Sequence, residues 1–372
     1  MATEHPNLPD YNPNAPADAS AGVFGVPGSY ETAKVVYLPI PWEATTSYGG
    51  GTVHGPEAIL AASAQLDLFD LDILKPYLHG LFWAPEIPGI SAMNSDASTR
   101  ALAIKEAGGV PDDRPELAIE LERVNRSSDE LNSKVRIETA KILRDGKIPG
   151  IIGGEHSVPF GAFQAAAECK GSFGILHFDA HSDTRSAYMG FRHSHASIMR
   201  NAAEQIPGIT RFVQVGIRDF CEEELEFTRS QGERFEVFYD QVLQSRKMSG
   251  TPFSNIAREI IQNLPEQVWV SFDIDGLDPR FCPHTGTPVP GGLDFSEALL
   301  ILRTLAKSGR KIIGFDLVEV APPLNGDGAP LEPVQAIDEW DANVAMRLLY
   351  KMSAYALASN GVAAWNPLTQ DA

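Results

Sequence analysis

The sequence predicts an α/β fold of three layers, in which helices cover both faces of a central, mostly parallel β-sheet. Apolar runs of strand length alternate with segments of helix length from about residue 34 to residue 358, and this alternation is typical of parallel sheets. Three of the apolar runs end in histidines and acidic residues, at the strand ends where α/β proteins bind ligands. No internal repeat or long linker divides the chain. We therefore expect one domain over residues 33–372, preceded by an irregular N-terminal arm over residues 1–32, which is either disordered or engaged in subunit contacts.

The composition is that of an ordinary soluble enzyme, with 43% hydrophobic and 21% charged residues among 372. A formal net charge of −19 argues against nucleic acid or an anionic membrane as a partner, and modestly favours a cationic small molecule. No apolar run has membrane-spanning length, and no basic-then-apolar signal opens the chain. Three isolated cysteines fit a reducing compartment, so a cytoplasmic location is expected. They are Cys169, Cys221 and Cys282.

The expected elements begin with a strand over residues 34–40 and a helix over 58–68, with Pro56 where a first helical turn tolerates it. Residues 78–114 are rich in Gly, Pro, Ser and Asp and are assigned neither a regular element nor chemistry. Further strands are expected over 148–152, 173–178, 211–217, 236–239, 267–273 and 311–317, and further helices over 159–167, 222–229, 254–263, 294–307 and 335–358.

The longest helical pattern spans residues 115–145 and predicts one or two amphipathic helices. Such a pattern most often packs in a core, and its length here also favours contacts within an oligomer. The apolar positions expected to face the core are Leu117, Ile119, Leu121, Val124, Leu131, Val135, Ile137 and Ile142.

The most informative stretch follows the strand expected over 173–178. Asp179, His181 and Asp183 are each two residues apart, and residues two apart in an extended chain point to the same side. One imidazole and two carboxylates gathered in one space repel and lose hydration unless a cation holds them. The spacing therefore indicates a metal site, against the alternative of a solvated loop.

Two other strands end in the same way. Asp273 and Asp275 follow the apolar run over 267–272, and His156 follows the run over 148–152. Together the three segments supply two imidazoles and four carboxylates, which is too many for one small cation. They suit two cations with some carboxylates bridging.

These segments resemble the signature motifs of the ureohydrolases, the arginase and agmatinase family. Residues 153–157 match G-G-[DE]-H-S, residues 179–183 match D-A-H-x-D, and residues 271–279 match S-x-D-x-D-x-x-D-P, in the order of the family. The resemblance covers about residues 35–360 and implies an arginase-like fold with a binuclear metal centre, which hydrolyses a guanidinium group to urea and ammonia or an amine. It implies that His156, Asp179, Asp183 and Asp273 hold one ion and that Asp179, His181, Asp273 and Asp275 hold the other.

The resemblance also implies two residues that act on the substrate. Glu319 matches the family glutamate that orients the guanidinium by a charge-assisted pair. His195 matches the histidine that relays a proton to the leaving nitrogen, and His193 is its close competitor because only spacing separates them. His177, two residues before Asp179, is interpreted as a buried structural imidazole rather than as a support for a ligand. Asp278 is expected to organise a turn rather than to bind metal.

Loops decide which guanidine is bound. Trp42 and Tyr48 either face a cationic substrate by cation–π contact or simply pack, and Thr287 is expected in the pocket wall. Residues 42–48 and 65–70 and the N-terminal arm look most like bacterial guanidine hydrolases, so free guanidine is favoured. The alternatives are agmatine and 4-guanidinobutanoate, for whose carboxylate Arg185 and Arg218 are possible partners. A different binuclear hydrolase and a non-catalytic ureohydrolase-like scaffold are the remaining alternatives.

The metal and the assembly are implied only by resemblance. A site rich in carboxylates with imidazoles suits Mn²⁺, the usual choice of the family, whereas likeness to guanidine hydrolases implies Ni²⁺. With nickel, metal-delivery accessory proteins are possible partners. The family resemblance implies a homo-oligomer, either a trimer or a hexamer.

Overall fold

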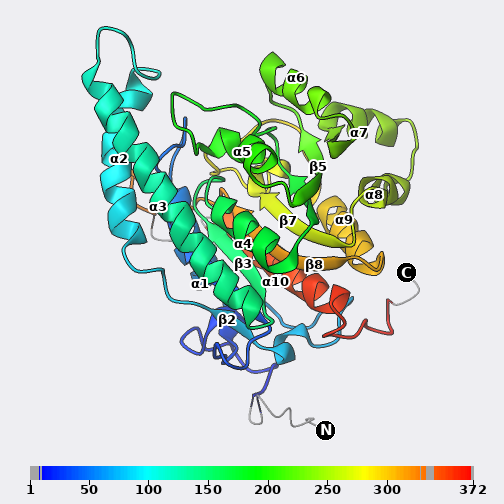
Figure 1. Cartoon of the computed structure of the whole chain (residues 1–372). Helices are drawn as coiled ribbons and strands as arrows, with labels where there is room; N and C mark the ends of the chain where they lie inside the picture. Colours follow the sequence, from blue (N-terminus) through cyan, green and yellow to red (C-terminus); the bar gives the residue numbers. More distant parts are fainter. Residues whose placement is uncertain (1–7, 9–10, 327, 332–338, 370–372) are drawn as a thin grey trace.

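A computed structural model describes residues 8, 11–326, 328–331 and 339–369. Its centre is an eight-stranded sheet in the order β2-β1-β3-β8-β7-β4-β5-β6, in which every neighbouring pair is parallel. Helices cover both faces of this sheet (Figure 1), so the predicted three-layer α/β fold is confirmed. The strands are β1 (Val35–Ile40), β2 (Leu81–Trp83), β3 (Ile148–Gly153), β4 (Phe173–Phe178), β5 (Ile209–Ile217), β6 (Phe235–Tyr239), β7 (Gln267–Asp273) and β8 (Lys311–Val318).

Two hydrophobic cores lie on the two faces of the sheet because side chains alternate along each strand. In β1, for example, Tyr37 belongs to one core and Leu38 to the other. The core that contains Tyr37 is closed by α1 (Gly55–Ser63), α7 (Asp240–Met248), α8 (Phe253–Gln262), α9 (Phe295–Lys307) and α10 (Trp340–Ser359). The other is closed by α2 (Ile90–Glu106), α3 (Glu116–Arg144), α4 (Phe160–Lys170), α5 (Ile198–Gln205) and α6 (Glu222–Ser230).

The structure adds elements that the sequence did not predict. The stretch over 78–114 contains β2 and the 17-residue helix α2, and α5 and α7 were not predicted. Helix α1 ends at Ser63 rather than at residue 68. The start predicted for the last helix, residues 335–338, lies outside the described residues. Short 3-10 segments are η1 (Val23–Gly25), η2 (Thr52–His54), η3 (Pro76–His79), η4 (His195–Ser197), η5 (Gly232–Arg234) and η6 (Ile274–Gly276).

The long pattern over 115–145 forms one helix, α3, which packs against α2 and α4. Most of its predicted core positions are buried, but Ile119 and Ile137 are 58% and 59% exposed. Figure 1 shows α2 and α3 projecting together beyond the body of the molecule, so the apolar stripe of α3 is wider than the surface that it covers.

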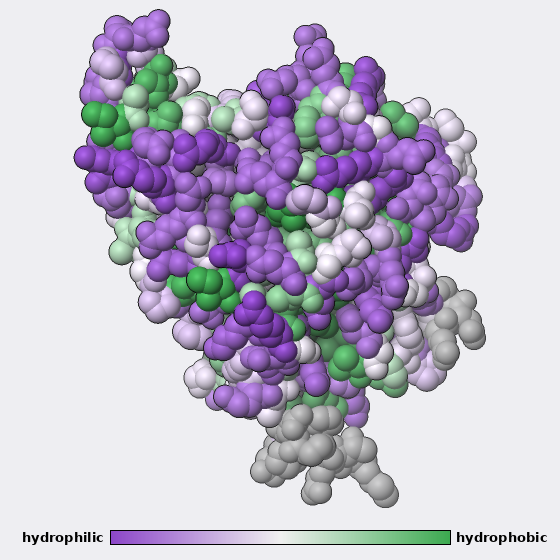
Figure 2. Space-filling view, in the orientation of Figure 1, coloured by the Kyte–Doolittle hydropathy of each residue, from purple (hydrophilic) through white to green (hydrophobic). Residues whose placement is uncertain are grey.

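The segment before β1 packs on the domain. Val23, Phe24 and Val26 are buried, and the ring of Phe24 meets those of Tyr37 and Tyr350 edge-on. Apart from residue 8, the first ten residues of the predicted arm lie outside the described residues. Among the helices that are described, none combines the length and the apolarity that a membrane crossing demands. The face in Figure 2 is mainly hydrophilic, with small separate hydrophobic patches.

Candidate metal centre

The histidines and carboxylates singled out in the sequence meet at one edge of the sheet. β3, β8, β7 and β4 are four consecutive strands at its centre, and the carboxyl ends of parallel strands share one edge. The backbone is closely packed at this edge and requires glycine after β3. A Cβ on Gly154 would lie 2.0 Å from the carbonyl oxygen of Trp42. His156 follows β3, Asp179 to Asp183 follow β4, Asp273 ends β7 and Glu319 follows β8.

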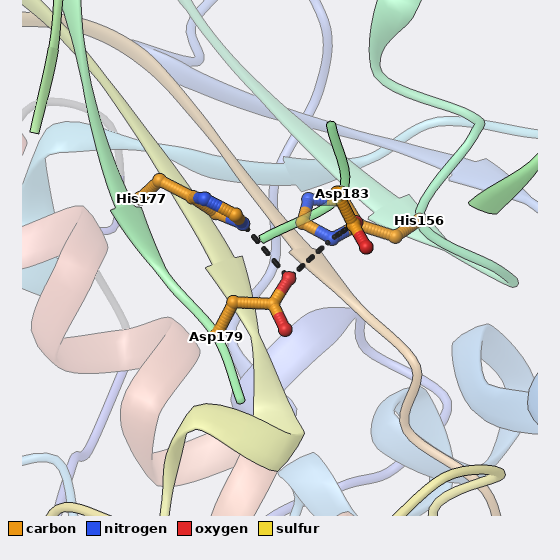
Figure 3. A group of neighbouring side chains, drawn as sticks. All are labelled: His156, His177, Asp179 and Asp183. Carbon is orange, nitrogen blue, oxygen red and sulfur yellow. Dashed lines mark hydrogen bonds and ion pairs between the residues drawn. The ribbon is translucent and has the colours of Figure 1, made fainter. Parts of the chain in front are cut away.

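The imidazole of His156 lies among three carboxylates. Its Nδ1 is 3.0 Å from Asp179 Oδ2, 3.0 Å from Asp183 Oδ2 and 3.3 Å from Asp273 Oδ2, and all four side chains are buried. Figure 3 shows the Asp179 carboxylate between the rings of His156 and His177, with Asp183 beside His156. Four ligand-type atoms, from His156, His177, Asp179 and Asp183, lie within 4.8 Å of one another, which is a grouping that could hold a metal ion.

A second group adjoins the first through Asp179. His181 Nδ1 is 3.0 Å from Asp275 Oδ2 and 3.4 Å from Asp179 Oδ1. Asp179 therefore turns one oxygen to His156 and the other to His181, as a carboxylate that bridges two cations would. Asp273 is held in a similar way, because its Oδ2 lies 3.3 Å from His156 Nδ1 and its Oδ1 accepts the backbone N–H of Asp275. The two groups together could hold two ions.

The charges of this cluster do not balance without cations. Burial and the nearby Asp179 raise the pKa of Asp183 to about 7. Burial, with the charges of Asp275 and Asp179, also raises the pKa of Asp273 well above its usual range. Burial alone would lower the pKa of His156, but hydrogen bonds to the surrounding carboxylates raise it. Among the described residues, Asp183 Oδ2 has His156 Nδ1 as its one neighbouring donor, at 3.0 Å, and His156 Nδ1 is shared with Asp179 and Asp273. Buried carboxylates in excess over imidazoles are the donor set that divalent cations satisfy.

Ser271 and Asp316 set the orientation of the His156 ring, and neither was predicted to have this role. Ser271 Oγ donates to Asp316 Oδ1 at 2.8 Å and lies 3.0 Å from His156 Nε2. Because the serine hydrogen goes to Asp316, its oxygen accepts from His156 Nε2–H, so Nδ1 is the nitrogen that faces the carboxylates. Nδ1 donates a hydrogen to them as the structure stands and would offer its lone pair to a bound cation. Trp269 Nε1 donates to the other oxygen of Asp316 at 2.6 Å. The sequence signal that could have identified Asp316 is an aspartate within the otherwise apolar strand β8.

Two site residues have left-handed backbones. Asp183 has φ 55° and Glu319 has φ 61°, a conformation that costs a residue with a side chain of order 1–3 kcal/mol. The turn at Glu319 is held by two hydrogen bonds, from its N–H to Gly154 O at 2.9 Å and from Thr285 Oγ1 to its carbonyl at 2.7 Å. Strain held in place by surrounding contacts is common at functional sites.

Glu319 and His195 lie side by side at the cluster. His195 Nδ1 is 3.8 Å from Glu319 Oε1, which accepts the backbone N–H of His156 at 2.7 Å. The backbone N–H of His195 donates to Thr45 Oγ1, which donates to the buried carboxylate of Glu155. Burial, aided by Glu155 and Asp275, raises the pKa of Glu319 well above its usual range.

A cavity of about 340 Å³ opens from this cluster to the surface. His156, His181, Asp183, His195 and Asp273 contribute to its lining near the carboxyl edge of the sheet. The lining also includes Arg185, Tyr188 and Thr287, and its exposed members Tyr48, Asp219 and Phe220 form the mouth. Tyr48 is 78% exposed, so it stands at the entrance, and Thr287 Oγ1 lies 3.4 Å from Asp275 Oδ2.

Three other residues that were considered as substrate contacts do not line the cavity. Trp42 is fully buried in the core that contains α2 to α6 and does not line the cavity, so of the two alternatives for its ring the structure has the packing one. His193 pairs with Asp129 of α3 at 3.1 Å and is also absent from the lining, whereas His195 is part of it. Arg218 donates to four backbone carbonyls, so its guanidinium is not free for a substrate carboxylate.

Fold and site together describe a parallel α/β protein with a two-part group of metal-type ligands at the carboxyl edge of its sheet. Within this class, the chain belongs to the arginase family, because the model of that family matches residues 33–352. Enzymes of this family hydrolyse guanidino C–N bonds, and the resemblance to arginases and agmatinases is confirmed.

Named relatives cover most of the chain. It is 34% identical to an N(1)-aminopropylagmatine ureohydrolase of Synechocystis over 79% of this chain and 83% of the relative. It is 31% identical to an agmatinase of Bacillus anthracis, over 79% and 86%, and 29% identical to a guanidinobutyrase of Pseudomonas aeruginosa, over 81% and 83%. The solved proclavaminate amidino hydrolase of Streptomyces clavuligerus is 25% identical, with a TM-score of 0.66 over 91% of this chain and 97% of that one.

Proposed function

We propose that this protein hydrolyses a guanidinium C–N bond to urea and ammonia or an amine, with two divalent metal ions bound at its carboxylate cluster. When bound, such a pair lowers the pKa of water and makes it nucleophilic at neutral pH. The observation that carries the proposal is the Asp179 carboxylate, whose two oxygens face two different histidines. His156, Asp179, Asp183 and Asp273 would hold one ion, and Asp179, His181, Asp273 and Asp275 the other.

Two further residues would act on the substrate directly. Glu319 would pair with the guanidinium. Burial raises the pKa of this carboxyl group, and the positive charge of the guanidinium would stabilise its ionised form. Burial, with the charges of His181 and His156, lowers the pKa of His195 to about 3. His195 is therefore a neutral imidazole at the cavity wall, and its proposed role as the relay of a proton to the leaving nitrogen is supported by its motif position and its place in the lining.

We infer that the substrate carries its guanidinium on a chain that ends in a cation. The cavity is larger than free guanidine and reaches solvent. Asp219 lies at its mouth and is exposed, with no side-chain partner among the described residues. Tyr48 and Phe220 add aromatic faces that suit an alkylammonium chain, whereas the ring of Tyr188 is already covered by the guanidinium of Arg185. Free guanidine, favoured by the sequence of the loops, is the second candidate, since it fits the same cluster without reaching Asp219.

Urea release from a panel of guanidines tests both candidates. Protein stripped with a chelator should release no urea, and refilling separately with Mn²⁺ and Ni²⁺ should restore release. The panel contains agmatine, N(1)-aminopropylagmatine, 4-guanidinobutanoate and free guanidine. Higher kcat/KM on the cationic chains supports the first candidate, and higher kcat/KM on free guanidine supports the second. If the protein binds two ions but releases urea from none of these compounds, the proposed hydrolase activity is contradicted. The non-catalytic ureohydrolase-like scaffold is then the remaining alternative.

Asp219→Asn should weaken binding of cationic chains selectively. Loss of one exposed charge contact of about 1 kcal/mol predicts a rise in KM for agmatine of about fivefold, with kcat and the KM for free guanidine unchanged. Steady-state kinetics on both substrates measures this. Glu223→Gln is the matched control, because Glu223 pairs with Arg200 on the surface and loses the same charge. Equal effects of the two variants would remove Asp219 from the substrate site.

Several finer predictions stay proposals. Both Mn²⁺ and Ni²⁺ suit the donor set, so metal identity, accessory proteins and trimeric or hexameric assembly are proposed only from the resemblance. A cytoplasmic location is proposed because Cys169, Cys221 and Cys282 are all free thiols. The division into an arm over 1–32 and a domain over 33–372 is likewise kept as a proposal.

A further inference from the structure

Two neighbouring strands carry a buried polar pair beneath the cluster. His177 of β4 and Gln214 of β5 lie opposite each other in the parallel register, and neither is exposed. Buried polar groups cost free energy unless they are hydrogen-bonded, so this pair needs partners. Asp179 provides one, because its Oδ2 lies 2.8 Å from His177 Nε2.

The surroundings of Gln214 determine which nitrogen of His177 carries the hydrogen. Gln214 Nε2 is 2.7 Å from the carbonyl oxygen of Ser182 and 3.0 Å from His177 Nδ1. A carbonyl only accepts, so the amide nitrogen, and not its oxygen, must face Ser182. The second hydrogen of that nitrogen is donated to His177 Nδ1. A neutral ring that accepts at Nδ1 carries its hydrogen on Nε2, where it points at Asp179.

We propose that His177 is a positioning residue that holds the Asp179 carboxylate in its bridging orientation, and that Gln214 keeps His177 in the donating tautomer. The inference rests on the two-ion site proposed above. Both oxygens of Asp179 are held by nitrogens: Oδ2 lies 2.8 Å from His177 Nε2 and 3.0 Å from His156 Nδ1, and Oδ1 accepts the backbone N–H of His181 at 2.5 Å. With both oxygens restrained, the carboxylate cannot rotate to give both of them to one ion, and each oxygen keeps lone pairs for a different ion.

This arrangement argues against His177 as a ligand. Its Nε2 lies among the ligand-type atoms around His156, but a nitrogen that carries a hydrogen has no lone pair to give. A metal ligand and a hydrogen-bond donor to Asp179 predict different effects when His177 is replaced by a side chain that still has an N–H. A glutamine at position 177 has an N–H to offer Asp179, whereas a phenylalanine keeps the ring shape and offers none.

Metal titration of His177→Phe, His177→Gln and Gln214→Met tests the inference without depending on catalysis. Calorimetry with Mn²⁺ gives the stoichiometry and the affinities, and melting of the metal-free proteins reports folding. His177→Phe should bind the weaker ion about tenfold or more less tightly, and Gln214→Met should shift in the same direction by less. His177→Gln should stay close to the wild type. If urea is released, kcat should fall in His177→Phe while KM changes little.

The alternatives give other patterns. Equal loss of metal in His177→Phe and His177→Gln, with Gln214→Met unaffected, would show a direct ligand and overturn the proposal. Lower melting temperatures with wild-type metal affinity in all three variants would show a role in packing alone and would also overturn it. A wild-type protein that binds two ions but releases no urea would instead contradict the proposed function, and the titration would still decide the role of His177.

Discussion

Replacing Asp179 by asparagine is expected to abolish urea release and to lower the bound metal from two ions per chain to one or fewer. The carboxylate is the only group in the described cluster that faces both His156 and His181, and an amide supplies one oxygen and no charge. Loss of about 4 kcal/mol of stabilisation at the reacting centre corresponds to roughly a 10³-fold fall in kcat. Elemental analysis and a urea assay under saturating Mn²⁺ or Ni²⁺ measure the two effects.

Asp278→Asn is the matched control for this substitution. Asp278 lies in the same motif, but its Oδ1 accepts the backbone N–H of Arg280 in a turn, a role that asparagine also performs. We expect this variant to keep two ions and wild-type rates. Full metal content and activity in Asp179→Asn would mean that the cluster does not bind its ions through this carboxylate.

The fold could be predicted wherever local pattern and tertiary role agree. The strands β4, β7 and β8 are apolar runs that end at charged residues, and their boundaries fall within one residue of those expected. Helix α2 was missed because it contains Asn94, Ser95, Asp96, Ser98 and Thr99, residue types that favour caps and turns over helix interiors. Long-range contacts hold it instead: Asn94 Oδ1 accepts the N–H of Glu43, and Ser98 Oγ donates to the carbonyl of Glu43.

The ligand-type residues could be gathered from sequence because their spacing is local and each set ends a strand. The direction of a side chain at a loop is decided by distant partners. His195 reaches the cavity because Thr45 binds its backbone, while His193 turns to Asp129 on α3. The partners of the supporting polar residues could not be predicted for the same reason, although His177 itself was considered as a support for a ligand. His177 and Gln214 are 37 positions apart, and Ser271 and Asp316 are 45 apart, so only strand register brings each pair together.

Replacing Glu319 by glutamine is expected to reduce kcat/KM by about 10²-fold or more while leaving both metal ions bound. Removing one charge of a buried, hydrogen-bonded ion pair costs about 2–5 kcal/mol, and the pair in question is the one between Glu319 and the guanidinium. The side chain does not belong to either group of ligand-type atoms, so metal content should not change. Steady-state kinetics with metal analysis on the same sample separates the two quantities.

Folding should not account for this loss. The pKa of Glu319 is raised by burial and by nearby Glu155 and Asp275, so the folded protein carries its charge at a cost that glutamine removes. The amide oxygen can still accept the N–H of His156, as Glu319 Oε1 does at 2.7 Å. We therefore expect the metal-free variant to melt at the wild-type temperature or above it. A lower melting temperature together with unchanged kcat/KM would make Glu319 a structural carboxylate that holds the turn after β8, and would leave the guanidinium without its proposed partner.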